Sequence, residues 1–167
     1  PADFTPVVLG DRRKETSWAH QISSAAVFTS PLLVYGGHPR SLIDNPAVEI
    51  IKSIPAVWDE TIVLPPSEIG EVAAFARRHG REWFVAVLNG ATARTITVPA
   101  KFLTPGRYAA SFVRDDPDNA AAVRVERGAV TPGDTLTIDL RAGGGFIVRL
   151  TPAAESSGPP RRSGSGS

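Results

Sequence analysis

The 167-residue chain contains no cysteine and no methionine, and its formal net charge is only +1. Without cysteine it can form no disulfide, no thiolate metal site and no cysteine nucleophile. Its 18 Lys and Arg residues are interspersed with 17 Asp and Glu residues, so neither nucleic acid nor a charged membrane surface is indicated as a partner. No apolar run reaches the ~18 residues of a membrane-spanning helix. The hydrophobic fraction of 42% suffices for a packed core in one or two small domains.

The chain begins with proline rather than methionine, and it shows no charged segment followed by an apolar one of the kind found in signal peptides. We therefore expect it to be the C-terminal piece of a longer protein. Any targeting signal would then lie upstream.

The segment from Glu82 to Gly90 organises the second part of the chain, because it is apolar on both sides. In an extended backbone its side chains fall on two faces, with Trp83, Val85 and Val87 on one and Phe84, Ala86 and Leu88 on the other. A helix is the alternative, but Asn89-Gly90 ends the run before it reaches helix length. The pattern predicts a strand that is covered on both faces.

Residues 1–53 predict strands that alternate with helices. A short extended segment is expected at 2–5, followed by Pro6 and an apolar run at 7–9, and a buried strand is expected at 32–35, where the apolar run stops at Gly36. A helix is expected after Thr16 or Ser17, whose hydroxyl can cap it. Its apolar stripe would be Trp18, Ile22, Ala25 and Ala26. A second helix is predicted from Asn45-Pro46 to about Ser53. Such alternation is typical of βαβ units in a parallel sheet.

After Pro55 the hydrophobic period changes to two. Strands are predicted near 61–64, 71–77, 82–88, 94–98, 107–113, 123–126, 135–140 and 146–150. Seven or eight short strands with turn signals every 8–12 residues indicate an antiparallel sandwich. Beyond residue 152 the chain has no apolar residue larger than alanine and is rich in Ser, Gly and Pro, so we predict a disordered tail.

A series of short segments occurs in an order that resembles the C-terminal part of glycoside hydrolase family 97. The segments are Asp3-Phe4-Thr5-Pro6, Ala19-His20-Gln21, Ser30-Pro31-Leu32, Val57-Trp58-Asp59-Glu60-Thr61, Glu68-Ile69-Gly70-Glu71, Ala76-Arg77-Arg78, Trp83-Phe84-Val85 and Gly143-Gly144-Gly145-Phe146. The resemblance covers residues 1–151, and the ordered series is more specific than any one of its motifs.

The resemblance implies a bacterial, periplasmic or secreted α-glucosidase or α-galactosidase. The fold class is then α+β, with an N-terminal βαβα fragment of a (β/α)₈ barrel followed by an antiparallel all-β sandwich. Residues 1–55 would supply the last two βα units of the catalytic barrel, 56–151 a bracing or oligomerisation sandwich, and 152–167 the disordered tail.

The same resemblance places the catalytic carboxylates, and the carboxylates that hold a calcium ion, upstream of Pro1. We therefore assign no catalytic or metal-binding residue to this chain, and we expect it to be inactive alone. Active sites of such barrels lie at the carboxyl ends of the strands. Asp3 and Phe4 after the seventh strand, and Tyr35 and His38 after the eighth, are the candidates for an active-site rim. A structural role is the alternative for each of them.

Other candidate sites have simpler structural interpretations. Asp59 and Glu60 are adjacent in an extended segment and should face opposite ways, so a domain junction with a buried Trp58 is favoured over an acid/base pair. Asp115, Asp116 and Asp118 lack the Gly and Glu of a calcium loop and predict a solvated hairpin. The run Gly143-Gly144-Gly145 precedes a strand rather than a helix, so it is not a phosphate-binding loop.

Histidines and tryptophans are also expected to be structural. We predict that His20 is packed or hydrogen-bonded rather than catalytic, and that His79 is solvated in a turn. The apolar surroundings of Trp18, Trp58 and Trp83 favour core positions over sugar-stacking platforms.

Two functions follow from these patterns. In the first, the chain completes a glycosidase that acts on oligosaccharides, and its sandwich serves self-association. In the second, it is a carbohydrate-binding module in its own right, although it offers few aromatic residues beyond those expected in the core. In either case the sandwich, with its own alternating core, is expected to fold without residues 1–53.

Overall fold

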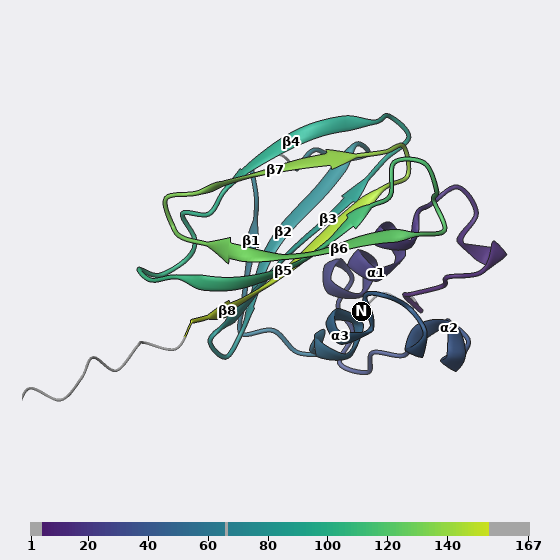
Figure 1. The fold of residues 1–167 in the computed structure, drawn as a ribbon, viewed down its shortest axis with the longest axis horizontal. Helices are drawn as coiled ribbons and strands as arrows, with labels where there is room; N and C mark the ends of the chain where they lie inside the picture. Colours follow the sequence, from purple (N-terminus) through teal and green to yellow (C-terminus); the bar gives the residue numbers. More distant parts are fainter. Residues whose placement is uncertain (1–4, 66, 154–167) are drawn as a thin grey trace, which may run out of the picture.

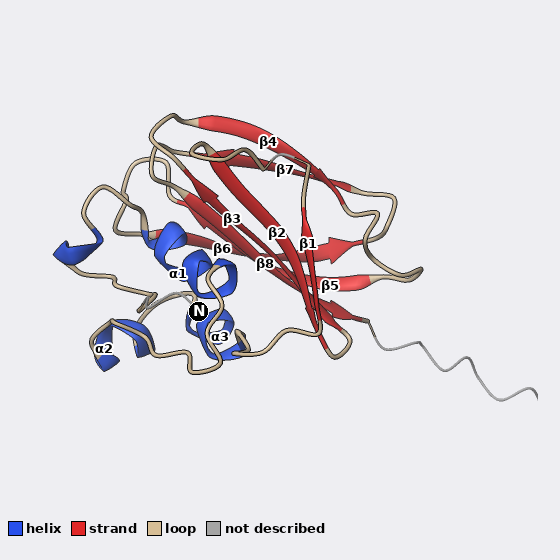
Figure 2. Ribbon diagram, turned by 180° about the vertical axis from the view of Figure 1, so that it is seen from behind, coloured by secondary structure: helices blue, strands red, loops and turns tan. Residues whose placement is uncertain are grey.

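The computed structural model describes residues 5–65 and 67–153, which form three layers (Figure 1). A small helical layer lies on one face of a six-stranded sheet, and a two-stranded sheet lies on the other face. Figure 2 shows the same layers from behind, with the helices gathered against one end of the large sheet. The predicted α+β class, with antiparallel strands after a helical segment, is confirmed.

The helical layer precedes all the strands in the sequence. It contains a 3₁₀ turn at Asp11–Arg13 and the helices α1 (Trp18–Val27), α2 (Pro39–Ile43) and α3 (Val48–Ser53). The strands are β1 (Glu60–Val63), β2 (Val72–His79), β3 (Glu82–Asn89), β4 (Arg94–Pro99), β5 (Tyr108–Asp115), β6 (Val123–Val130), β7 (Thr135–Leu140) and β8 (Gly145–Pro152). Each of the eight predicted strands is present, with ends shifted by a few residues.

All strand pairs are antiparallel. The large sheet has the order β1-β2-β3-β8-β5-β6, and β4 pairs with β7 in the small sheet. Strand β3 lies between β2 and β8, and every residue from Trp83 to Asn89 is buried. The prediction that this segment is a strand covered on both faces is confirmed.

One apolar core fills the space between the two sheets. Trp83, Val85 and Val87 point into it from β3, and Val98 and Ile138 face them from the small sheet. Trp83 also packs against Phe102, with 5.1 Å between ring centroids. Burial of a side chain of this size stabilises the fold by about 1.5–3 kcal/mol. This core corresponds to the sandwich that the alternating pattern predicted.

A second apolar core lies on the opposite face of the large sheet, under helix α1. Ser17 caps this helix, since its Oγ accepts a hydrogen bond from His20 N at 3.0 Å. The predicted stripe of α1 faces the sheet: Ile22, Ala25 and Ala26 are buried, and Trp18 is half-buried. It packs on the face that Phe84, Ala86, Leu88, Val113 and Ile147 form. Helix α1 is therefore the cover of the large sheet's second face.

The helical layer differs locally from the sequence prediction. Within the described part of residues 1–53 the structure has no strand. The segments predicted as strands run side by side, joined by a hydrogen bond of 2.8 Å from Gly36 N to Pro6 O. A parallel strand needs a hydrogen-bonded ladder, and one bond does not make one. Leu32 is 77% exposed and Val34 53%, so this run is not buried in the chain as it stands.

The second predicted helix, α3, is shorter than expected, and the structure contains one more helix, α2, that the sequence did not predict. Asn45 Oδ1 accepts a hydrogen bond from Ala47 N, and α3 begins only at Val48 before it ends at Ser53 as predicted. Helix α2 has Pro39 at its first position and His38 as its cap. None of the helices in the described residues is long and apolar enough to cross a membrane.

At the C-terminal end, β8 continues through Pro152, and Ala153 N donates to Arg107 O at 2.8 Å. The sandwich thus extends slightly beyond the predicted boundary at residue 151. The remainder of the predicted disordered tail lies outside the described residues, as do the candidate rim residues Asp3 and Phe4.

Candidate functional site

Helix α1 is fastened to the sandwich at its first turn by a buried carboxylate. Asp115, at the end of β5, accepts hydrogen bonds from Ser17 Oγ at 2.5 Å, from Gly145 N at 3.1 Å and from Arg141 N at 3.3 Å. Ser17 N donates to Gly143 O, and Trp18 N to Ala120 O, both at 2.9 Å. Two of the amide groups that a helix leaves unpaired at its start are therefore bound by loops of the sandwich.

The three consecutive glycines allow this close approach. A Cβ added to Gly143 would lie 2.6 Å from Glu15 O, and one added to Gly145 would lie 2.4 Å from the Cα of His20. Gly144 has no room either, because its Cβ would lie 2.1 Å from Asp115 Oδ2. Gly143 also has a positive φ of 61°, which glycine adopts readily. The glycine run was not expected to be a phosphate-binding loop. In the structure it lets the start of α1 pack directly against the backbone of the sandwich.

His20 lies in the same contact. Its Nδ1 is 3.0 Å from Gly144 O. Burial lowers the pKa of His20, although the bond to Gly144 and the charge of Asp115 act in the opposite direction. Burial likewise raises the pKa of the Asp115 carboxyl, against the effect of its hydrogen bonds from Ser17, Arg141 and Gly145. The contact is thus a hydrogen-bonded structural joint, as predicted for His20.

The prediction that Asp115 belongs to a solvated loop is wrong, since only 5% of its surface is exposed. Asp118 is exposed and Asp116 half-buried, and the Asp116 carboxylate accepts hydrogen bonds from the Asp118 and Asn119 amides. The error arose because all three acids share one local sequence, whereas the burial of Asp115 depends on Ser17, 98 residues away.

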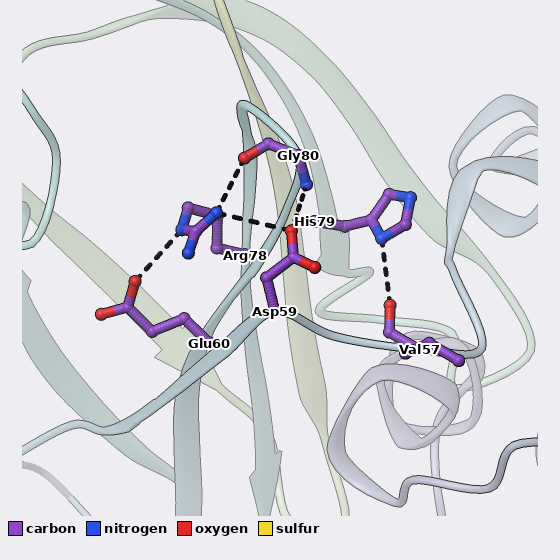
Figure 3. A network of polar contacts seen from close by, with 6 residues as sticks. All are labelled: Val57, Asp59, Glu60, Arg78, His79 and Gly80. Carbon is purple, nitrogen blue, oxygen red and sulfur yellow. Dashed lines mark hydrogen bonds and ion pairs between the residues drawn. The ribbon is translucent and has the colours of Figure 1, made fainter.

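A second joint fixes the segment between α3 and β1 to the β2–β3 turn (Figure 3). The Arg78 guanidinium lies between two carboxylates, 3.4 Å from Asp59 Oδ2 and 3.1 Å from Glu60 Oε2. Asp59 also accepts a hydrogen bond from Gly80 N at 2.7 Å, and His79 Nδ1 is 3.1 Å from Val57 O. His79 is exposed, as predicted, and it also makes this contact.

The structure corrects the argument made for the two acids of this joint. They were expected to face opposite ways, yet both contact one guanidinium. Asp59 precedes β1, so strand alternation does not apply to it, and the long Arg78 side chain spans both. The conclusion that they form a junction rather than an acid/base pair is unaffected.

A third joint ties the end of α1 to β2 through a buried arginine. Arg77 Nη2 donates to Val27 O at 3.0 Å, and the guanidinium lies over the rings of Phe75 and Trp58 at 5.3 and 5.8 Å. Burial lowers the pKa of Arg77. Trp58 is half-buried and meets Phe84 edge to face at 5.3 Å, so it is packed rather than displayed to a sugar.

The two candidate rim residues that the structure describes lie near each other in the chain but make separate contacts. Tyr35 Oη donates to Ile51 O at 2.9 Å, and burial raises the pKa of Tyr35 to about 12. His38 is exposed and caps α2, with its Nδ1 accepting from Arg40 N at 3.2 Å. Each therefore has a local structural role, and contact of either with a substrate stays a prediction.

The described residues contain no group of three or more His, Asp and Glu side chains that could hold a metal ion. Their carboxylates mostly form the joints described above or lie at the surface. The arrangement can therefore position one layer against another.

The described residues thus form a helical layer docked on an antiparallel β-sandwich. The family described as "Glycosyl-hydrolase 97 C-terminal, oligomerisation" matches residues 57–151. The chain belongs to this family, as its ordered motifs indicated.

Relatives and solved structures agree with this assignment. The retaining alpha-galactosidase of Bacteroides thetaiotaomicron is 32% identical over 134 residues, which make up 78% of this chain and 20% of that enzyme. A glycoside hydrolase family 97 enzyme from Pseudoalteromonas sp. strain K8, solved in complex with acarbose, has a TM-score of 0.84 and 26% identity. That match covers 92% of this chain and 26% of the enzyme chain.

A beta-arabinopyranosidase shares the fold, with a TM-score of 0.69 at 22% identity over 81% of this chain and 21% of its own. This chain therefore spans about a fifth to a quarter of the length of these three proteins. The comparisons support the glycosidase interpretation and not the alternative of a free-standing carbohydrate-binding module.

Proposed function

We propose that this chain serves as the C-terminal part of an α-glycoside hydrolase that acts on α-galactosides or α-glucosides. The observation that carries the proposal is the docking of α1 on the sandwich through Ser17, Asp115 and the glycine run. Leu32 and Val34, in the segment between α1 and α2, are exposed to solvent. One layer thus binds the sandwich and leaves an apolar surface for a catalytic barrel.

In this proposal the chain braces the barrel and supplies no chemistry. Residues 1–55 complete the barrel as its last two units, with Asp3, Phe4, Tyr35 and His38 near the rim of the active site. By family resemblance, the catalytic carboxylates and the calcium ligands belong to other parts of the whole enzyme. Two properties stay proposals from family resemblance alone: a periplasmic or secreted location, and self-association through the sandwich.

The experiment compares two proteins with 4-nitrophenyl α-galactoside and α-glucoside as substrates. The purified 167-residue chain should show no turnover above a buffer blank. A full-length enzyme that carries this sequence should hydrolyse at least one of the two. Deletion of residues 57–151 from that enzyme should remove most of its activity or lower its melting temperature. Turnover by the chain alone, or an unchanged enzyme after the deletion, would show that the proposal is wrong.

A further inference from the structure

A groove of about 450 Å³ is lined by residues of β1, β2 and the end of β3, together with the turn between β1 and β2. Its apolar lining includes Val63 from β1, Phe75 from β2 and Leu88 from β3, with Ile69 at its margin. The family description assigns oligomerisation to a region that matches residues 57–151. The question is which surface of that region a partner would contact.

Exposed apolar side chains restrict the choice. In the described part of residues 57–151, four large hydrophobic side chains are exposed: Val57, Val63, Ile69 and Val125. Two of the four, Val63 and Ile69, lie at this one groove. Clustered exposed apolar surface is typical of a protein contact, whereas single exposed residues are common on any surface.

Ile69 is held in a projecting position. It occupies the second position of a turn that is closed by a hydrogen bond of 3.0 Å from Glu71 N to Glu68 O, with a φ of +83° at Gly70. The turn is fixed to the end of β3, because Gly90 N donates to Glu71 O at 2.8 Å. Turn positions usually carry Gly, Pro, Asn, Asp or Ser. Here the turn presents a fully exposed isoleucine beside an apolar groove.

The polar side chains of the groove form most of their hydrogen bonds within the chain, which favours a protein contact over a sugar, although the buried Asn89 Oδ1 has no partner among the described residues. Ser67 Oγ exchanges two hydrogen bonds with the backbone of Ala74, both at 2.9 Å. The Asn89 amide nitrogen donates to Thr92 O and Arg141 O at 2.8 and 2.7 Å. The rim carries Glu68 and Glu71, the latter paired with Arg94, so nucleic acid or an anionic membrane would not be favoured.

We infer that this surface, formed by Val63, Ile69, Phe75 and Leu88, is where a second copy of the chain binds, and that the two copies exchange Ile69 side chains. The inference rests on the self-association proposed above. A two-fold contact requires a surface that is complementary to itself. A projecting side chain next to an apolar groove meets this requirement, because the two-fold axis places each Ile69 in the groove of the other copy. The acidic rim then stays at the edge of the contact, where solvent screens it.

The first test measures self-association of the whole chain by sedimentation velocity over a dilution series. Ile69→Lys places a charge at the exposed turn, where no buried contact of the monomer is lost, and should raise the dimer Kd at least tenfold. Val125→Lys is the matched control, since Val125 is also exposed but lies on β6 at the opposite edge of the sheet. Its dimer Kd should stay within about twofold of that of the natural chain, the spread usual for a surface change outside a contact.

The outcomes separate the two claims. If the natural chain stays monomeric up to high micromolar concentrations, the proposed self-association is itself wrong. If the natural chain dimerises and the Ile69→Lys variant dimerises with the same Kd, the surface assigned here is wrong, although the chain does self-associate.

The absence of cysteine allows a second measurement on the same contact. Two mixtures of mass-tagged variants are compared under mild oxidation. Ile69→Cys mixed with Val63→Cys should give a higher yield of mixed disulfide dimer than Ile69→Cys mixed with Val125→Cys. Equal yields from the two mixtures would contradict the exchange of Ile69 side chains.

Discussion

Ser17 Oγ, at the cap of α1, donates a hydrogen bond of 2.5 Å to Asp115 at the end of β5. This contact joins the helical segment to the sandwich across 98 residues of sequence. The same carboxylate accepts bonds from the backbone of Arg141 and Gly145, so one side chain organises the start of a helix and the turn before β8.

Asp115→Ala should lower the free energy of unfolding by about 2–3 kcal/mol, because it leaves several buried donors without an acceptor. Asp115→Asn keeps an oxygen acceptor and removes a buried charge, so its loss should be smaller. Urea denaturation at pH 7 measures both. Asp118→Ala, a change at an exposed acid in the same loop, is the control and should stay within about 0.5 kcal/mol of the natural chain. An equally small loss for Asp115→Ala would contradict the joint.

Gly145→Ala should be destabilising by about 3 kcal/mol or more, since its Cβ would meet backbone atoms of Ala19 and His20 at less than 3 Å. Backbone atoms cannot rotate away as a side chain does, so α1 must shift. Gly133→Ala is the matched control, because the nearest atom would be 3.9 Å away. Thermal unfolding measures the melting temperatures of both variants. Equal melting temperatures would contradict the close packing of α1 against Gly145.

The free energy of unfolding should decrease as the pH falls below 6.5, because of His20. Its folded-state pKa is lowered, so the unfolded chain binds more protons as the pH falls from 6.5 toward that lowered value, and stability decreases over this window. His20→Gln should have a flatter decline of unfolding free energy between pH 7 and pH 5. His79→Gln controls for the loss of an imidazole as such. A decline in His20→Gln as steep as in the natural chain would assign the effect to other groups.

Much of the fold follows from local sequence patterns. The period-two segments gave all eight strands, and the two apolar faces around Trp83 and Phe84 predicted that β3 is covered twice. What covers the second face could not be predicted, because the contact between α1 and the sheet joins residues far apart in the chain. The burial of Asp115 was missed for the same reason.

The predicted strands of residues 1–53 show the opposite limit. Their apolar composition is that of buried strands, but a strand also needs neighbours with which to form a ladder. Only one backbone hydrogen bond, from Gly36 N to Pro6 O, joins the two segments in the described residues. The composition of a segment indicates that it can form a strand, but the strand forms only where a neighbouring strand is available for pairing.

The expectation that the sandwich folds without the preceding residues stays a prediction, and the packing of α1 bears on it. Removal of α1 would expose the apolar face that contains Phe84, Leu88 and Ile147. A sheet with one such face uncovered is expected to aggregate or to lose stability. The boundary near Pro55 therefore marks a change of pattern in the sequence, while the packing continues across it.

Native-state hydrogen exchange read by mass spectrometry tests most directly whether α1 and the sandwich form one folded unit. If they do, the amides of Trp18–Val27 and those of Glu82–Asn89 exchange through the same opening, with equal free energies and equal dependence on denaturant. If α1 opens at a clearly lower free energy while β3 stays protected, the helix is only loosely attached. That result would contradict the role of the chain as a brace.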